Sequence, residues 1–151
     1  MATVRPARAS APTEQRLGML LRGAEQAMVR AKTAVLKPIG LTLAQFVALG
    51  ELERRPGITA ATLARACLVA PQAMMVLLKT MDEQGLVSRS PNERHPNVLE
   101  LNMTSAGREA LYSARKAVDP VERRAIAAFS ATELERLRAL LLRVCKAFDT
   151  S

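Results

Sequence analysis

The stretch that decides the fold is APQAMMVLLKTMDEQ at residues 70–84, followed by Gly85 and by LVSRSPNERHPNVLELNMT at residues 86–104. Its first part has apolar residues spaced i, i+3, i+4 and i+7, which is the inward stripe of an amphipathic helix. These residues are Met74, Leu77, Leu78 and Met81. Pro71 suits the first helical position, where no N–H is needed, and Gly85 suits the left-handed residue that ends a helix. We therefore expect a helix with both ends set by local chemistry.

After Gly85 the pattern changes from helical to alternating, with apolar residues at positions 99, 101 and 103 and polar residues between them. LVSRS and VLELNM thus predict a two-stranded ribbon. A short helix from Thr59 to Ala66 is predicted upstream, because Thr59 can cap it. A supporting helix, a second helix and a ribbon, in this order, form a winged helix-turn-helix, which places one helix in the DNA major groove and the ribbon in the neighbouring minor groove.

The outward face of the helix that begins at Pro71 would then meet DNA. At 100° per residue it carries Gln72, Val76 and Lys79, flanked by Met75 and Thr80. A glutamine amide can pair with adenine and a lysine with a phosphate or guanine, whereas valine and methionine offer only apolar contact, for instance to a thymine methyl. An ordinary exposed helix surface would explain the same residues, so the interpretation depends on the flanking elements.

The loop Pro91–Asn97 is the predicted tip of the ribbon, and two prolines restrict its conformations. It presents Arg94, which could enter a narrow minor groove, where the negative potential is enhanced. A soluble turn rich in Asn and Pro is the alternative explanation.

Length and composition predict one mainly helical domain. A chain of 151 residues can bury one core, and two full domains are not expected. Hydrophobic residues make up 49% of the chain but aromatic residues only 3%, so the core must be built from Leu, Ala, Val and Met, which favours packed helices. The net charge of +8 suits a polyanionic partner, although the basic residues are spread out and a generally cationic surface explains most of them.

Several classes of function lack the residues they need. The longest apolar run, AMMVLL, is far too short to span a bilayer, and residues 1–12 have no signal-peptide core. We expect a disordered N-terminal arm, no membrane contact, and a cytoplasmic, nucleoid-associated protein. One His, Cys67 and Cys145 form no metal-ligand spacing, and catalytic motifs are missing. We therefore predict no enzyme activity, no metal and no cofactor, with both cysteines as small buried apolar side chains.

Two further helices are predicted before this stretch. The first runs from about Thr13 to Leu36 on its apolar spacing. The second begins at Thr42, where T-x-x-Q to Gln45 forms a capping box, and stops near Arg54.

Two more are predicted after it. The fifth begins at Thr104, and the D-P-x-E beginning at Asp119 is expected to restart or kink it. Ser130 and Glu133 form a capping box for the sixth. The apolar stripes of the first, fifth and sixth helices are broader than a small lobe can cover, so these helices need a partner surface.

Three stretches, taken in order, resemble the MarR family of bacterial transcriptional regulators, over about residues 14–148. They are GLTLAQFVAL, ITAATLARACLVAPQAMMVLLKTMDEQGLV and LNMTSAGREAL. The resemblance implies about six helices plus a two-stranded wing, and a homodimer paired through the first, fifth and sixth helices. It implies a repressor on a pseudo-palindromic operator of double-stranded DNA, released by a small aromatic or phenolic ligand bound between the dimer region and the DNA-binding lobe.

Three positions depart from the family pattern. Counting back from Met103, the family's wing Asp and Arg fall on His95 and Asn97, so these two residues join Arg94 as expected wing contacts with DNA. Met75 stands at a position of the recognition helix that is often polar in the family.

A ligand pocket is expected to combine arginine with aromatic residues, which would suit a small aromatic carboxylate. A structural or solvent-exposed role would also explain each candidate. The candidates are Arg16, Arg22, Gln26, Phe46, Tyr112 and Arg115.

The expected organisation is an N-terminal arm at residues 1–12 and one unit at residues 13–151. In that unit residues 41–103 form the winged helix-turn-helix lobe, and residues 13–40 and 104–151 form dimerisation helices. The alternative function is a winged-helix module that binds another protein through its apolar helix face, with weak or no DNA binding.

Overall fold

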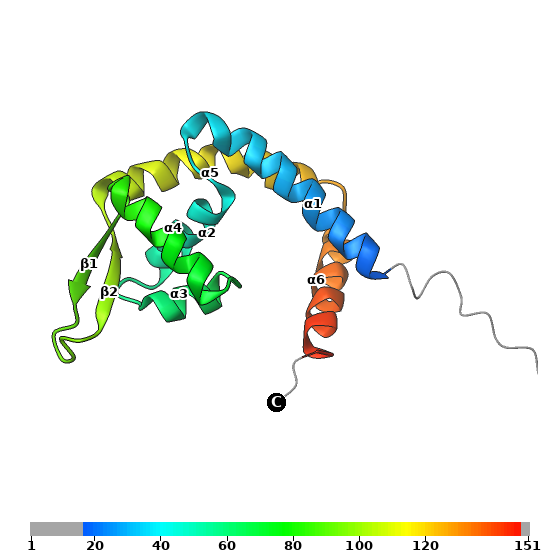
Figure 1. Ribbon diagram of the computed structural model, residues 1–151. Coiled ribbons are helices and arrows are strands. Elements are labelled where there is room, and N and C mark those ends of the chain that lie inside the picture. The colour runs from blue at the N-terminus through cyan, green and yellow to red at the C-terminus, as the bar shows by residue number, and fades with distance from the viewer. Residues whose placement is uncertain (1–16, 149–151) are drawn as a thin grey trace, which may run out of the picture.

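The computed structural model describes residues 17–148, and in that range the chain forms six α-helices, a short 3-10 helix and a two-stranded sheet (Figure 1). The predicted mainly α winged fold is confirmed. The elements are α1 (Leu17–Leu36), η2 (Lys37–Ile39), α2 (Leu43–Arg54), α3 (Ala60–Ala66), α4 (Pro71–Glu83), β1 (Val87–Pro91), β2 (Leu99–Met103), α5 (Ser105–Ile126) and α6 (Ala131–Lys146). Residues 13–16, where the first helix was expected to begin, lie outside the described residues.

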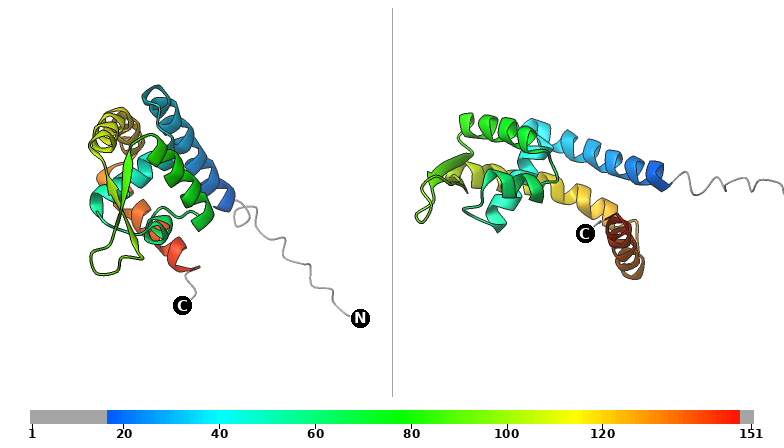
Figure 2. Two further views of the ribbon diagram at one scale, coloured as in Figure 1. Left: turned by 60° about the vertical axis from the view of Figure 1, so that its left-hand side comes forward. Right: turned by 60° about the horizontal axis from the view of Figure 1, so that its bottom comes forward.

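The helices form a long arch and one lobe. α1 and α5 lie side by side along the arch, and α2, α3, α4 and the β-ribbon pack together beneath one end of α5 (Figures 1 and 2). α6 turns away at the other end of α5 and lies apart from the lobe. No single described helix is long and apolar enough to cross a membrane, although two bent pairs, α1–η2 with α2 and α3 with α4, have that length and composition.

Side-chain caps mark the starts of α2, α3, α5 and α6. The Thr42 hydroxyl accepts from the Gln45 backbone N–H at 3.2 Å, while the Gln45 carbonyl oxygen Oε1 accepts from the Thr42 N–H at 2.9 Å, so the predicted capping box of α2 is present. The Ser130–Glu133 capping box of α6 is present as well.

The core lies inside the lobe and extends to α5 and the end of α1. Its largest fully buried side chains come from α1, α2, α3, α4, β2 and α5, and burying each contributes roughly 1.5–3 kcal/mol relative to leaving it exposed. They are Leu36, Leu49, Leu52, Leu63, Met74, Leu78, Met81, Leu101 and Leu111.

The ribbon is antiparallel, with Val87 paired to Met103 and Pro91 to Leu99. The centre of β2 is joined to the loop before α3, because the Leu101 N–H donates to the Ile58 carbonyl at 2.9 Å. Leu99 is 50% exposed, so the ribbon extends past the core. Of the three apolar residues expected on one face of β2, only Leu101 and Met103 pack against the core.

Two details of the C-terminal part differ from expectation. α5 continues through Pro120 as one helix to Ile126, so of the restart or kink expected at Asp119 the restart is excluded. Cys145 is exposed rather than buried, because α6 buries none of its residues within the protomer.

Candidate nucleic-acid interface

α4 is oriented as its sequence spacing predicts. Met74, Leu78 and Met81 are completely buried, and Leu77 is half-buried against the core. The five predicted DNA-facing residues of α4 are all exposed, and they are Gln72, Met75, Val76, Lys79 and Thr80. The structure therefore brings these side chains together on one accessible helix face.

The C-terminal end of α4 is fixed by backbone and side-chain hydrogen bonds. Gly85 has a φ of 68°, and the Leu86 N–H donates to the Met81 carbonyl at 2.9 Å, as the Schellman closure requires. Gln45, only 2% exposed, donates from Nε2 to Oε1 of Gln84 at 2.7 Å. The start of α2 thus holds the end of α4 through a hydrogen bond between the buried Gln45 amide and the exposed Gln84 amide, which the capping-box pattern does not reveal.

The polar groups on the outer face of α4 interact mostly with one another. Lys79 Nζ lies 4.0 Å from a carboxylate oxygen of Glu83, and the Thr80 hydroxyl donates to the Val76 carbonyl at 3.3 Å. Asp82 lies 3.8 Å from Arg89 of β1. The first two turns, residues 71–78, carry no charged side chain.

The wing loop is organised by Asn92. Its side-chain oxygen accepts from the N–H groups of Arg94 and His95, both at 2.8 Å, and its Nδ2 donates to Glu100. Arg94, His95 and Asn97 are exposed around this turn. Sequence reasoning missed Asn92, although an Asn that accepts from backbone N–H groups two and three residues later is a known turn signal.

The described members of the predicted ligand set lie on α1, α2 and α5. Arg22 and Gln26 are exposed on α1, and Tyr112 is exposed on α5. Phe46 packs half-buried against the core. Arg16 lies outside the described residues.

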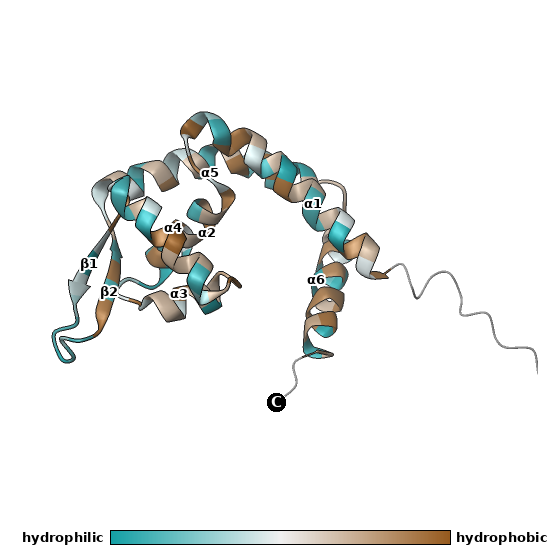
Figure 3. Ribbon diagram, viewed as in Figure 1, coloured by the Kyte–Doolittle hydropathy of each residue, from teal (hydrophilic) through white to brown (hydrophobic). Residues whose placement is uncertain are grey.

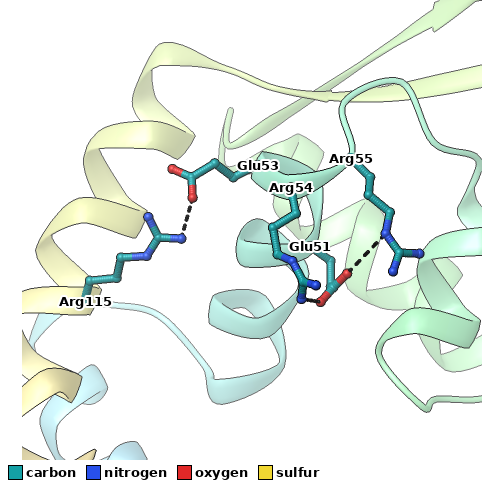
Figure 4. Close-up of polar contacts among 5 residues, drawn as sticks. All are labelled: Glu51, Glu53, Arg54, Arg55 and Arg115. Carbon is teal, nitrogen blue, oxygen red and sulfur yellow. Dashed lines mark hydrogen bonds and ion pairs between the residues drawn. The ribbon is translucent and has the colours of Figure 1, made fainter.

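Arg115 bonds instead to Glu53 across the α2–α5 junction, and this contact lowers the pKa of the Glu53 carboxyl (Figure 4). Nearby, Glu51 accepts from Arg54 at 2.9 Å. Ion pairing thus accounts for Arg115 without a ligand.

Two apolar grooves that sequence reasoning missed lie between α2 and α4. The larger has a volume of about 320 Å³ and includes Thr42, Val69, Ala73, Val76 and Thr80 in its lining. The second, of about 210 Å³, includes Cys67. Burial raises the pKa of the Cys67 thiol, and the nearby Glu51 charge adds to the effect. Within residues 17–148 no cluster of His, Cys, Asp and Glu is suited to a metal ion.

A helix-turn-helix whose second helix exposes one face, followed by a two-stranded ribbon, defines the chain as a winged helix-turn-helix protein. Comparisons with known proteins show which family of winged helix-turn-helix proteins the chain belongs to. The MarR family model matches residues 39–95. The HTH-type transcriptional repressor Rv2887 of Mycobacterium tuberculosis is 32% identical over 125 residues, covering 83% of this chain and 90% of the relative. The chain belongs to the MarR family.

Solved structures agree with this membership. The crystal structure of Rv2887 in complex with salicylic acid aligns with a TM-score of 0.67 and 31% identity, covering 85% of this chain and 95% of that one. A mutant MarR from E. coli in complex with operator DNA aligns with a TM-score of 0.79 and 25% identity, covering 85% of this chain and 92% of that one.

Proposed function

We propose that this protein is a transcriptional repressor that binds operator DNA with α4 in the major groove and the β1–β2 wing in the adjacent minor groove. The observation that carries the proposal is the exposed face of α4, continued by Arg94 at the wing tip. Gln72, Met75, Val76, Lys79 and Thr80 would contact the major groove, and Arg94, His95 and Asn97 the minor groove. The operator-bound MarR supports the proposal, because its fold is shared.

The repressor acts as a homodimer in this proposal. α6 runs from Ala131 to Lys146 without burying one residue in the protomer, although apolar residues lie along it (Figure 3). Leu17, Leu140 and Val144 line an open hollow between α1 and α6. An amphipathic helix owes most of its stability to packing of its apolar face, so a second copy of the chain is the natural cover.

This assembly assigns the parts of the chain as the sequence suggests. Residues 41–103 are the DNA-binding lobe, and residues 13–40 and 104–151 supply the dimer contacts. Two such lobes on a two-fold axis call for a pseudo-palindromic operator.

A small aromatic ligand is the proposed effector. The salicylic acid bound by Rv2887 supports this class of molecule, and the grooves between α2 and α4 offer apolar walls next to Val76. Titration of DNA-bound protein with salicylic acid should release the DNA, and the free protein should melt at a higher temperature with the ligand present. If salicylic acid changes neither the melting temperature nor DNA binding, the proposed effector is wrong.

The DNA proposal is tested by fluorescence anisotropy with genomic fragments at several salt concentrations. The logarithm of the affinity should fall linearly with the logarithm of salt, by roughly 0.9 for each phosphate contact. Lys79→Ala and Arg94→Ala should weaken binding and reduce this slope by about one unit each if they contact phosphates. Lys37→Ala, which removes an exposed charge from η2, is the control and should change neither affinity nor slope.

Binding by wild type that neither Lys79→Ala nor Arg94→Ala alters would show that the interface is placed wrongly. If the wild type binds no fragment, the chain is better described as a module that binds another protein through Met75 and Val76.

A further inference from the structure

The first two turns of α4 expose side chains of unusual composition for a helix that reads bases. The exposed residues are Pro71, Gln72, Ala73, Met75 and Val76, which are one amide and four apolar groups. Met75 is 49% exposed and Val76 69% exposed. In a helix-turn-helix the N-terminal residues of the recognition helix contact the base edges, so these five residues limit what can be read.

Each base presents different groups in the major groove and is therefore recognised by a different kind of side chain. Guanine offers two acceptors, which Arg or Lys reads, and cytosine offers a donor, which Asp or Glu reads. Adenine offers an acceptor beside a donor, which matches a glutamine amide, and thymine offers a methyl group, which matches an apolar side chain. Residues 71–78 contain the partners for adenine and thymine and neither charged partner.

The next turn of α4 supplies no side chain that is as free to hydrogen-bond to guanine as an unpaired Arg or Lys would be. Lys79 lies 4.0 Å from Glu83 on the following turn, so its ammonium faces a carboxylate as well as solvent. The Thr80 hydroxyl already donates to the Val76 carbonyl of its own helix. Asp82 and Glu83 are exposed near the end of α4, where their charges oppose a close approach of phosphates.

We infer that the base pairs facing the first two turns of α4 are A·T pairs, with adenine read by Gln72 and thymine methyl groups by Met75 and Val76. The inference rests on the proposed function and specifies the class of operator half-site that it requires. Gln72 then discriminates between base pairs by hydrogen bonding, and Met75 and Val76 discriminate by burying apolar surface.

The experiment begins by selecting bound duplexes from a random library and locating the α4 contacts by footprinting. In the best duplex each thymine of a half-site is replaced singly by uracil, which lacks the methyl group. Losing one buried methyl, worth about 0.8 kcal/mol, should weaken binding about fourfold at the thymines under Val76. With Val76→Ala, uracil substitution at the same positions should have no further effect.

Gln72 has a parallel test. Replacing the contacted adenine by 7-deazaadenine removes the N7 acceptor, which should weaken wild-type binding about tenfold. With Gln72→Ala the modified and natural duplexes should bind equally. Both variants change exposed side chains, so unaltered thermal unfolding is expected and checks that they fold.

The outcomes separate the inference from the proposed function. A wild type that binds no duplex contradicts both. A wild type that binds tightly but selects G·C pairs under α4, or that tolerates uracil and 7-deazaadenine there, overturns the inference and leaves DNA binding standing. Uracil outside the α4 contacts is the internal control and should leave affinity unchanged.

Discussion

Leu68, in the turn between α3 and α4, combines two unfavourable features. Its φ is 56°, and it is the one non-glycine residue with a positive φ among residues 17–148. Its side chain is 93% exposed and therefore gains almost nothing from packing. A residue with a Cβ pays an energetic penalty in this conformation that glycine avoids.

We predict that Leu68→Gly raises the free energy of unfolding by about 1 kcal/mol, since the relief of strain exceeds the extra entropy glycine gives the unfolded chain. Urea denaturation of the variant measures it. Leu68→Ala keeps the Cβ and should show no such gain, so equal stability of the two variants would contradict a strained turn.

We predict that Asn92 affects DNA binding only by positioning Arg94. Its side chain accepts hydrogen bonds from backbone N–H groups within the wing turn and does not extend beyond the turn. Asn92→Ala should weaken binding of the selected duplex several-fold in the wild type and hardly at all in an Arg94→Ala background. Anisotropy titrations of the four proteins give this double-mutant cycle. Additive losses would mean that Asn92 contacts DNA itself or supports the whole lobe.

At the scale of elements, the start of α5 lies in close contact with the chain that joins α4 to the wing. The Thr104 hydroxyl donates to the Gly85 carbonyl at 2.6 Å, and a Cβ built on Gly107 would lie 2.1 Å from the Leu86 carbonyl oxygen. The first turn of α5 is therefore pressed against the chain that leaves α4, and this contact sets the direction of the wing.

Gly107→Ala should destabilise the protein by about 3 kcal/mol or more, since the clash is with backbone that cannot rotate away. Gly50→Ala is the matched control within α2, where an added Cβ meets nothing within 4 Å and should stabilise by about 1 kcal/mol. Thermal unfolding of the two variants checks both signs, and a mild effect of Gly107→Ala would contradict the close contact.

The cap of α6 gives a pH-dependent prediction. Hydrogen bonds from Ser130 lower the pKa of the Glu133 carboxyl. A carboxyl with a lowered folded-state pKa stabilises the fold above its ordinary pKa, and this contribution disappears as pH falls through the lowered value. Wild type should therefore lose more stability on acidification than Glu133→Gln, which keeps a neutral capping box. If wild type and Glu133→Gln lose equal stability in thermal unfolding between neutral pH and a pH below the lowered pKa, then Glu133 does not stabilise the fold in this way.

The elements predicted correctly are those whose signals are local. Thr42 with Gln45, Ser130 with Glu133, and Pro71 with Gly85 mark helix ends because capping involves residues within one turn. Pro120 shows the limit, since packing of α5 against α1 and the lobe outweighs the local cost of a proline. The Asn92–Glu100 contact and the α2–α4 grooves depend on elements meeting in space, which spacing along the chain does not encode.

At the scale of the whole molecule, the protomer has an unpartnered end. Leu141 and Leu142 of α6 are 41% and 58% exposed, and Phe148 just beyond α6 is 81% exposed. The homodimer proposed for this end would bury them. In that proposal the oligomeric state is part of the DNA-binding mechanism, since a dimer would set the spacing of the two α4 helices.

We predict that Leu142→Glu shifts the protein from dimer to monomer in analytical ultracentrifugation, because it places a charge in the proposed apolar interface. Leu99→Glu, at a wing leucine that is 50% exposed, should leave the dimer intact. A Leu142→Glu protein that sediments like wild type would place the interface elsewhere.

The most direct test of the account is a hydroxyl-radical footprint of the wild-type protein on its selected duplex. Two lobes held by one dimer should protect two half-sites related by a pseudo-two-fold axis, about one helical turn or a whole multiple of it apart. A single protected half-site, or protection that Gln72→Ala with Lys79→Ala leaves unchanged, would contradict a dimer that reads DNA with α4.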